Sequence, residues 1–160
     1  MRAQKRTYLR IGISVVVCLL IGALAGFATQ SSVGTWYPTL AKPAFTPPDW
    51  LFGPVWTLLY LLMGIAAGLV WARGFHHIWV KTALYYFGFQ LLVNGSWSLV
   101  FFGLQNPQVA LVVIWALLVL IVLTIRSFRV VSKRAAWLMV PYLLWVLFAS
   151  LLNLRIVQLN

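Results

Sequence analysis

The sequence predicts an all-α integral membrane protein, with residues 1–160 forming one domain built as a bundle of five transmembrane helices. Apolar residues make up 63% of the chain and charged residues 8%, whereas soluble domains average about 45–50% and about 25%. Five stretches are long and apolar enough to cross the hydrocarbon core, which needs about 20 residues of helix. They are residues 11–29, 51–72, 79–103, 107–125 and 135–154.

The first stretch, residues 11–29, is too long for a cleaved signal peptide, and no small-residue cleavage pattern follows it. The basic residues around the five stretches predict the orientation of the chain. Ten of the twelve lie on the side of the N-terminus: Arg2, Lys5, Arg6, Arg10, Arg73, Lys81, Arg126, Arg129, Lys133 and Arg134. Short loops rich in Lys and Arg stay in the cytoplasm. We therefore expect a cytoplasmic N-terminus, an outside C-terminus and an odd number of spans.

The distribution of the basic residues over the two sides of the membrane also bears on the net charge of +11. The positive charges do not gather on one soluble face, so nucleic acid is not an expected partner. Anionic membrane lipid accounts for the basic side without any macromolecule. The expected location is a bacterial cell (inner) membrane.

Residues 30–49 form the one long connection, a Pro- and Trp-rich loop between the first and second spans. Pro43, Pro47 and Pro48 fix their own backbone angles and extend the residues before them. We therefore expect a rigid lid rather than a flexible linker. Asp49, the only acidic residue, is expected to cap the second helix by accepting backbone N–H bonds.

Three spans each carry one stripe of aromatic, small and polar residues at helical spacing. The stripes are Trp56, Tyr60, Gly64 and Ala67 in the second span, Gln90, Asn94, Trp97 and Phe101 in the third, and Tyr142, Trp145, Ala149 and Asn153 in the fifth. Because Gln90 and Asn94 cannot face lipid cheaply, we expect the stripes to face the interior of the bundle. Pro141 precedes the last stripe and is expected to kink its helix.

Two interpretations of the stripes stay open. Taken singly, their polar residues can bond neighbouring helices, and their rings can fill the core. Taken together, they predict an apolar pocket with a few polar groups, the usual form of a small-molecule site between bundle helices. Several Trp faces would suit a flat ligand. Close helix packing is expected at two small-residue pairs, Gly22 with Gly26 and Gly64 with Gly68.

The composition excludes most catalytic chemistry. One acidic residue allows no carboxylate pair, which excludes glycosidase-like, proton-antiport and two-metal mechanisms. His76 and His77 are adjacent and have no Cys, Asp or Glu beside them, so no metal site is expected. No nucleophile with a base and an orienting group is recognisable. We assign no catalytic residue with certainty and expect no required cofactor.

The loop and the stripes also carry a family pattern. Its parts are Trp36–Tyr37, Leu40, Lys42–Pro43, Phe45, Pro47–Pro48, Trp50, Pro54, Trp56, Leu59–Tyr60, Met63–Gly64, then Asn94, Trp97, Phe101–Gly103, and then Pro141–Tyr142, Trp145, Phe148–Ala149 and Leu152–Asn153. Over about residues 12–155 the chain resembles a bacterial-type member of the TspO/MBR family. That family comprises the translocator proteins, or tryptophan-rich sensory proteins, and includes the peripheral-type benzodiazepine receptor.

The resemblance implies a five-helix bundle, often a homodimer, that binds porphyrins, haem, isoquinoline carboxamides and, in animals, cholesterol. By analogy the ligand contacts Tyr37, Trp56, Asn94, Trp97, Trp145 and Ala149, to which the stripes add Tyr60, Phe101 and Tyr142. Animal members have a Tyr in a C-terminal cholesterol motif where Leu154 stands here, so sterol binding is not expected.

Three functions follow as alternatives. The first is a tetrapyrrole-binding membrane protein for protoporphyrin IX or haem, acting as sensor, scavenger or carrier. The second is a light-dependent porphyrin-degrading enzyme, in which Trp97 and Trp145 would take a photochemical role. The third is a lipid- or sterol-handling or structural membrane subunit. No histidine lies inside a predicted span to serve as an axial haem ligand, so we expect binding by stacking that tolerates metal-free protoporphyrin.

Overall fold

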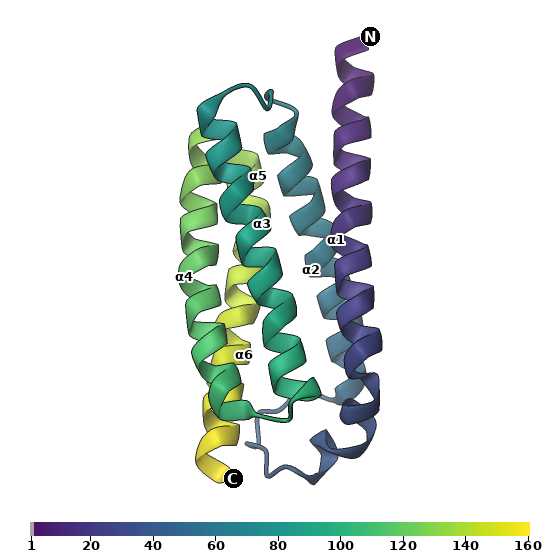
Figure 1. Ribbon diagram of the computed structural model, residues 1–160, viewed down its shortest axis with the longest axis vertical. Helices are drawn as coiled ribbons and strands as arrows, with labels where there is room; N and C mark the ends of the chain where they lie inside the picture. The colour runs from purple at the N-terminus through teal and green to yellow at the C-terminus, as the bar shows by residue number, and fades with distance from the viewer. Residues whose placement is uncertain (1) are drawn as a thin grey trace.

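The computed structural model describes residues 2–160, and all regular elements in that range are helical. In order they are α1 (Arg2–Thr35), the short 3-10 helix η1 (Tyr37–Thr39), α2 (Asp49–Trp71), α3 (Ile78–Ser98), the π-helical segment η2 (Leu99–Gly103), α4 (Pro107–Val131), α5 (Lys133–Leu138) and α6 (Val140–Leu159). The long helices run alternately up and down, with α1 at one side of the bundle and α4 at the other (Figure 1).

The expected bundle of five helical spans is confirmed. α5 and α6 together form the fifth span, and the break between them falls at Met139, two residues before Pro141. Proline cannot donate to the preceding turn, and the helix is interrupted next to the position where a kink was expected. Within residues 2–160, four spans are long and apolar enough to cross a membrane: Arg2–Thr35, Asp49–Trp71, Pro107–Val131 and Lys133–Leu159. α3 has 21 residues and is less apolar because it carries the polar stripe.

Two expected boundaries differ from the structure. α1 continues to Thr35, so residues 30–35, expected as loop, are helical, and the lid is limited to residues 36–48. No proline interrupts this stretch, and the Thr35 hydroxyl donates to the Ser31 carbonyl at 2.7 Å within the last turn. The third span is α-helical only to Ser98, after which the Leu104 amide donates to the Leu99 carbonyl at 2.9 Å, five residues back.

α1 packs on α2 through glycines, as expected, at three of the four positions. A Cβ on Gly64 would lie 2.5 Å from the Val15 Cα atom, and one on Gly68 would collide with the Ile11 backbone. Gly22 lies equally close to the Tyr60 ring. The expectation for Gly26 is wrong, since a Cβ there would meet nothing within 4 Å. The two helices therefore touch between Ile11 and Gly22 of α1 and diverge toward the lid.

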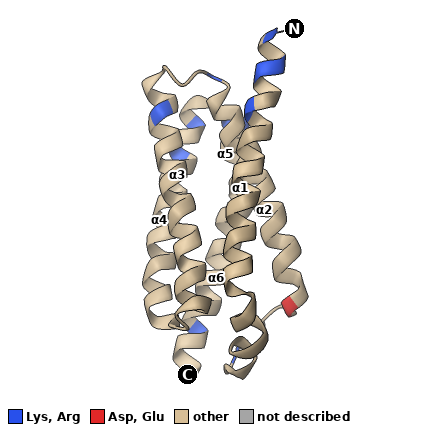
Figure 2. Cartoon of the chain, turned by 45° about the vertical axis from the view of Figure 1, so that its right-hand side comes forward, with Lys and Arg blue, Asp and Glu red and all other residues tan. Residues whose placement is uncertain are grey.

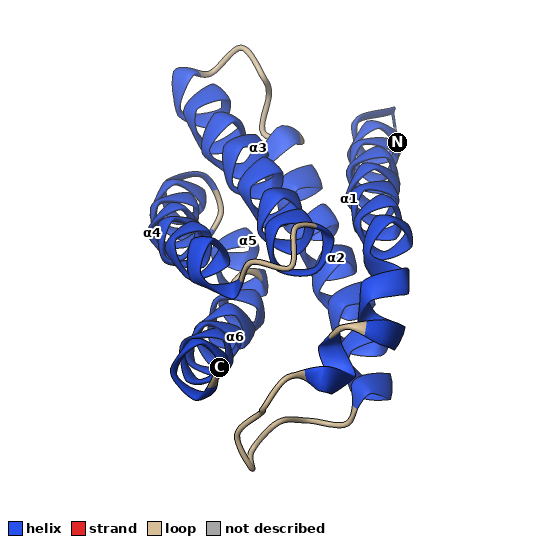
Figure 3. Cartoon of the chain, turned by 60° about the horizontal axis from the view of Figure 1, so that its bottom comes forward, coloured by secondary structure: helices blue, strands red, loops and turns tan. Residues whose placement is uncertain are grey.

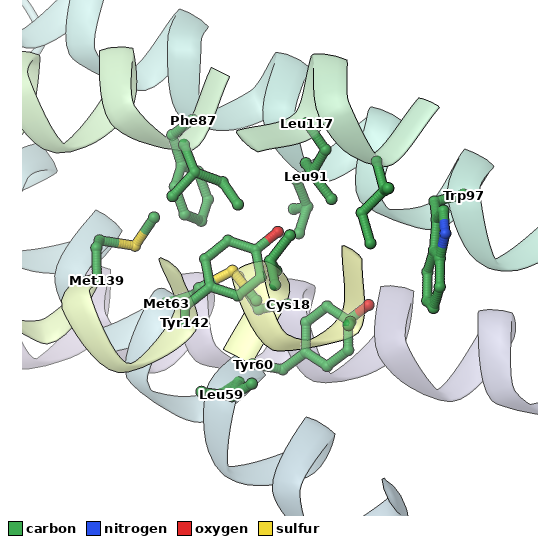
Figure 4. Close-up of a cluster of buried hydrophobic side chains, with 14 of the residues drawn as sticks. Cys18, Leu59, Tyr60, Met63, Phe87, Leu91, Trp97, Leu117, Met139 and Tyr142 are labelled. Carbon is green, nitrogen blue, oxygen red and sulfur yellow. The ribbon is translucent and has the colours of Figure 1, made fainter. Parts of the chain in front are cut away.

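The core lies where α2, α3, α4 and α6 meet, and α1 adds Cys18 to it. Met63, Tyr142 and Cys18 are fully buried there, and Figure 4 shows Tyr142 beside Met63, with Tyr60 below. Cys18 is a free, buried thiol and packs there as a small apolar residue. These contacts fill the middle of the bundle and leave the lid end less tightly packed.

Charge is divided between the two ends of the bundle. The basic ends of α1, α3, α4 and α5 meet near the N-terminus, while the single acidic residue, Asp49, lies at the opposite end (Figure 2). At the basic end, the Arg10 guanidinium donates to the Trp71 carbonyl at 3.2 Å and so satisfies a free carbonyl at the end of α2. Lys42 and Arg155 are the two basic residues at the lid end.

Candidate ligand-binding cavity

A cavity of about 630 Å³ fills the wedge where α1 and α2 diverge, closed on its other sides by α3, η2 and α6. Its wall includes Gly22, Gly26, Thr29 and Gln30 from α1, Tyr37 from η1, Asp49, Phe52, Gly53, Trp56, Thr57 and Tyr60 from α2, Asn94, Trp97 and Ser98 from α3, Phe101 and Phe102 from η2, and Trp145, Ala149, Leu152, Asn153 and Ile156 from α6. Figure 3 views the bundle from this end and shows the helices that surround the wedge.

The structure brings together eight of the nine residues predicted as ligand contacts. Tyr37, Trp56, Tyr60, Asn94, Trp97, Phe101, Trp145 and Ala149 all line the cavity. Tyr142 does not: its side chain is 0% exposed and lies deeper in the core. The residues of the α6 stripe therefore lie at two depths in the bundle. Trp145 and Ala149 line the cavity wall, and Tyr142 lies in the core beneath it.

Trp56 is the centre of the aromatic wall. Its ring centroid is 6.2 Å from that of Trp97, with the planes 32° apart, and 6.5 Å from that of Trp145, with the planes 89° apart. The Tyr60 ring lies 5.9 Å from it on the core side. Tilted and edge-to-face pairs at such distances are favourable, so the rings hold one another in place and present flat faces to the space between them.

A buried chain of hydrogen bonds forms the floor beneath this wall. The Tyr60 hydroxyl donates to Asn94 Oδ1, and Asn94 Nδ2 donates to the Tyr142 hydroxyl at 2.7 Å. The Tyr142 hydroxyl in turn donates to Gln90 Oε1 at 2.8 Å, and Gln90 Nε2 lies 3.8 Å from Met63 Sδ. The interpretation of polar stripe residues as links between helices therefore holds for Asn94 and Gln90, which join α3 to α2 and α6.

Trp97 is positioned by a second pair of bonds. Its Nε1–H donates to Asn153 Oδ1 at 3.2 Å, and Asn153 Nδ2 donates to the Pro107 carbonyl at 2.9 Å. That carbonyl is at the start of α4. The indole of Trp97 is thus tied through α6 to α4, which fixes the plane of its ring in the cavity wall.

Trp145 differs from its neighbours in its polar atom. Among the buried side-chain nitrogen and oxygen atoms of residues 2–160, Trp145 Nε1 is the one without a hydrogen-bond partner. A buried donor left without a partner costs about 1–3 kcal/mol. Because Trp145 lines the cavity, a bound molecule with an acceptor atom could remove that cost.

The lid closes the cavity with Tyr37, which is only 4% exposed. Its ring packs against Phe102 at 5.6 Å and Phe52 at 6.5 Å. Lys42 Nζ donates to the Tyr37 carbonyl at 2.9 Å and lies 4.6 Å from the Tyr37 ring centroid. Burial, helped by the negative charge of Asp49, raises the pKa of Tyr37 to about 12, so its hydroxyl stays neutral at physiological pH.

The side chain of Asn160 ties the lid to the end of α6. The Ala41 amide donates to Asn160 Oδ1 at 3.1 Å, and Asn160 Nδ2 donates to the Ala41 carbonyl at 2.9 Å. Phe45 adds an edge-to-face contact with Phe148, with ring centroids 6.1 Å apart. The lid is therefore held by side-chain-to-backbone hydrogen bonds and ring contacts, while its expected rigidity stays a prediction.

The expected capping role of Asp49 is wrong. α2 begins at Asp49 itself, Pro48 takes the capping position, and no side chain makes a capping hydrogen bond there. The carboxylate lies in the first turn, where a negative charge is still favoured by the helix dipole. It is exposed and stands on the wall of the cavity.

Comparison with known proteins agrees with this architecture. The TspO/MBR family matches residues 14–159. The chain belongs to this family. The tryptophan-rich protein TspO of Chlorobaculum tepidum is 44% identical over 157 residues, which cover 98% of this chain and 99% of the relative. The protein of the same name from Archaeoglobus fulgidus is 47% identical over 152 residues, or 95% of this chain and 97% of the relative. The human translocator protein is 39% identical over 120 residues, or 74% of this chain and 70% of the relative.

The helix α1 is the part of this TspO/MBR cavity that sequence reasoning missed. It contributes Gly26, Thr29 and Gln30 to the wall, yet it is apolar on nearly every side and shows no stripe that separates cavity from lipid. Two signals were available. The polar pair Thr29–Gln30 ends an apolar run. Glycine also recurs one turn apart, at Gly22 and Gly26, where no side chain is present to fill the space beside the helix.

The polar atoms on the wall belong to amides, hydroxyls, indoles and one exposed carboxylate. His76 and His77 lie against each other at the other end of the bundle, with ring centroids 4.1 Å apart. No group of three His, Cys, Asp or Glu residues comes together within residues 2–160.

Proposed function

We propose that this TspO/MBR family protein binds tetrapyrroles, such as protoporphyrin IX or haem, and acts as their sensor, scavenger or carrier in the membrane. The observation that carries the proposal is the cavity at the lid end, whose wall combines the rings of Trp56, Trp97 and Trp145 with a buried indole N–H that has no partner. Ligand pockets of about 300–1,000 Å³ are typical for molecules of this general size.

The shape of the wall favours a planar ligand. The Trp56 and Trp97 rings are tilted by 32° to each other, and Trp145 stands nearly at a right angle to Trp56. Gly26 on α1, and Gly53 one turn before Trp56 on α2, leave open space, since a Cβ on either would meet nothing within 4 Å. A flat macrocycle gains stacking on one side and meets no bulky side chain on the other.

The polar groups specify how such a ligand would be held. Asn94 uses both ends of its amide in the floor, whereas Trp145, also on the cavity wall, has a buried Nε1–H without a hydrogen-bond partner. A pyrrole nitrogen or a carboxyl oxygen can accept from it. No histidine lines the cavity, so the proposed binding needs no iron, and the tetrapyrrole is a ligand rather than a cofactor required by the fold.

The proposal includes a membrane orientation. The basic ends of four helices meet at the N-terminal end of the bundle, and short basic segments stay in the cytoplasm. The protein would then lie in the bacterial cell membrane with its lid and C-terminus outside. The cavity would open at the outer level of the bilayer, and anionic lipid would contact the cytoplasmic end.

The test is a titration of the purified protein with protoporphyrin IX, followed by the shift of the porphyrin absorbance band, which does not depend on tryptophan content. The wild type is expected to saturate. Trp145→Phe keeps the ring contacts but removes the donor, and it is expected to weaken binding about tenfold, the equivalent of one net hydrogen bond. Trp115→Phe, on the outer face of α4 and 50% exposed, is the matched control and is expected to bind like the wild type.

The outcomes separate the three functions. Binding that never saturates would reject the proposal and favour a structural or lipid-handling subunit. Equal weakening by Trp145→Phe and Trp115→Phe would reject the assigned cavity. A new product spectrum that forms only in the light, and that Trp145→Phe abolishes, would favour the porphyrin-degrading enzyme.

A further inference from the structure

The one acidic residue of the chain stands on the rim of the cavity. Asp49, Phe52, Gly53 and Trp56 follow one another on a single face of α2, and all four line the cavity. Asp49 is the outermost of the four and is exposed, as are Gly53 and Gln30 on the same rim. A ligand that stacks on Trp56 would therefore direct its outer edge toward the Asp49 carboxylate.

The Asp49 carboxylate neither caps its own helix nor has a nearby basic side chain free to pair with it. It makes no capping hydrogen bond to α2. The nearest basic residue along the lid, Lys42, is held by Tyr37, through the carbonyl at 2.9 Å and the ring centroid at 4.6 Å. Arg155 on α6 donates to Gln158 Oε1 at 2.9 Å. The charge of Asp49 is thus directed to solvent and to the cavity.

The negative charge of Asp49 also acts on Tyr37, a residue of the aromatic wall. Together with burial, which is the larger cause, the negative charge of Asp49 raises the pKa of Tyr37. The Tyr37 side chain closes the cavity from the lid. The carboxylate is therefore near enough to the ligand space to act on a charged group placed there.

We propose that Asp49 makes the cavity selective for the charge at the outer edge of its ligand. It disfavours planar ligands that direct carboxylates through this rim and favours those whose outer edge is neutral, esterified or carries a protonated amine. The proposal rests on the function proposed above and narrows it, because free tetrapyrrole dicarboxylates would be weaker ligands than their neutral relatives of the same ring. Two like charges at this kind of partly exposed rim repel enough to change affinity roughly three- to tenfold.

The experiment compares two porphyrins that differ only in charge, protoporphyrin IX and its dimethyl ester, on the full-length protein. Asp49→Asn is expected to strengthen binding of the dicarboxylate by roughly three- to tenfold and to change binding of the diester by less than about twofold. Arg155→Gln is the matched control, since it removes an exposed charge at the same end, outside the cavity wall, and it is expected to leave the ratio of the two affinities near the wild-type value.

A measurement on the wild type alone gives a second test. Because salt screens exposed charges, raising the salt concentration is expected to strengthen binding of the dicarboxylate and to leave the diester unaffected. Equal effects of Asp49→Asn on both porphyrins, or no effect on either, would overturn the inference and leave the tetrapyrrole function standing. Failure of both porphyrins to bind the wild type would overturn the two proposals together.

Discussion

Gly64→Ala is expected to lower the stability of the protein by about 3 kcal/mol, the upper end of the usual cost of overpacking. The added Cβ would lie 2.5 Å from the Cα atom of Val15. That neighbour is backbone, so relief requires α1 to move away from α2 along the seam that Gly68 and Ile11 also form. A fall of roughly 5–10 °C in the midpoint of thermal unfolding in detergent is expected.

Gly88→Ala is the matched control for this prediction. Gly88 lies in the interior of α3, and a Cβ there would meet nothing within 4 Å. Alanine is the better helix residue by about 0.5–1 kcal/mol, so this variant is expected to match or exceed the wild-type stability. If both variants unfold at the wild-type temperature, the close seam between α1 and α2 is not present in the protein.

Asn94→Leu is expected to destabilise the floor of the cavity by about 2–3 kcal/mol. The change removes the acceptor of the Tyr60 hydroxyl and the donor to the Tyr142 hydroxyl, and it leaves buried polar groups without partners, each at a cost of about 1–3 kcal/mol. Tyr60 and Tyr142 belong to α2 and α6, so the loss is shared by three helices. The midpoint of thermal unfolding measures it directly.

Ser96→Ala isolates the effect of the Asn94 network. Ser96 is exposed on the same helix, and its hydroxyl bonds only the Leu92 carbonyl, at 2.9 Å. Surface changes of this kind usually stay within about 0.5 kcal/mol. Were Asn94→Leu to prove as mild as Ser96→Ala, the buried chain from Tyr60 to Gln90 would not contribute to stability as described.

The bundle and most of the cavity wall follow from the sequence because a bilayer restricts the solutions. A spanning helix must satisfy its own backbone and keep polar side chains from lipid. Gln90 and Asn94 therefore had to face inward, and the helical period carried Trp97 and Phe101 to the same side. The same reasoning placed Trp56 with Tyr60 and Trp145 with Ala149, and the structure unites these residues around one cavity.

The remaining features depend on depths within the bundle, helix ends and separations between helices, which the periodicity of the sequence does not specify. A stripe specifies a face but not a depth, so Tyr142 was grouped with Trp145 although one lies in the core and the other on the wall. The position of Asp49 depended on whether α2 begins at that residue or after it, a difference of one residue that decides between a cap and an exposed rim charge. The contribution of α1 depended on the divergence of two helices, which appears only when Gly64 and Gly26 are compared in space.

A structure of the protein with protoporphyrin IX bound would show directly whether the cavity is the porphyrin site. The macrocycle is expected in the wedge between α1 and α2, stacked on Trp56 or Trp97, with an acceptor atom within about 3.2 Å of Trp145 Nε1. A macrocycle found on the lipid-facing surface, with the cavity empty and Trp145 Nε1 still unpartnered, would contradict this expectation.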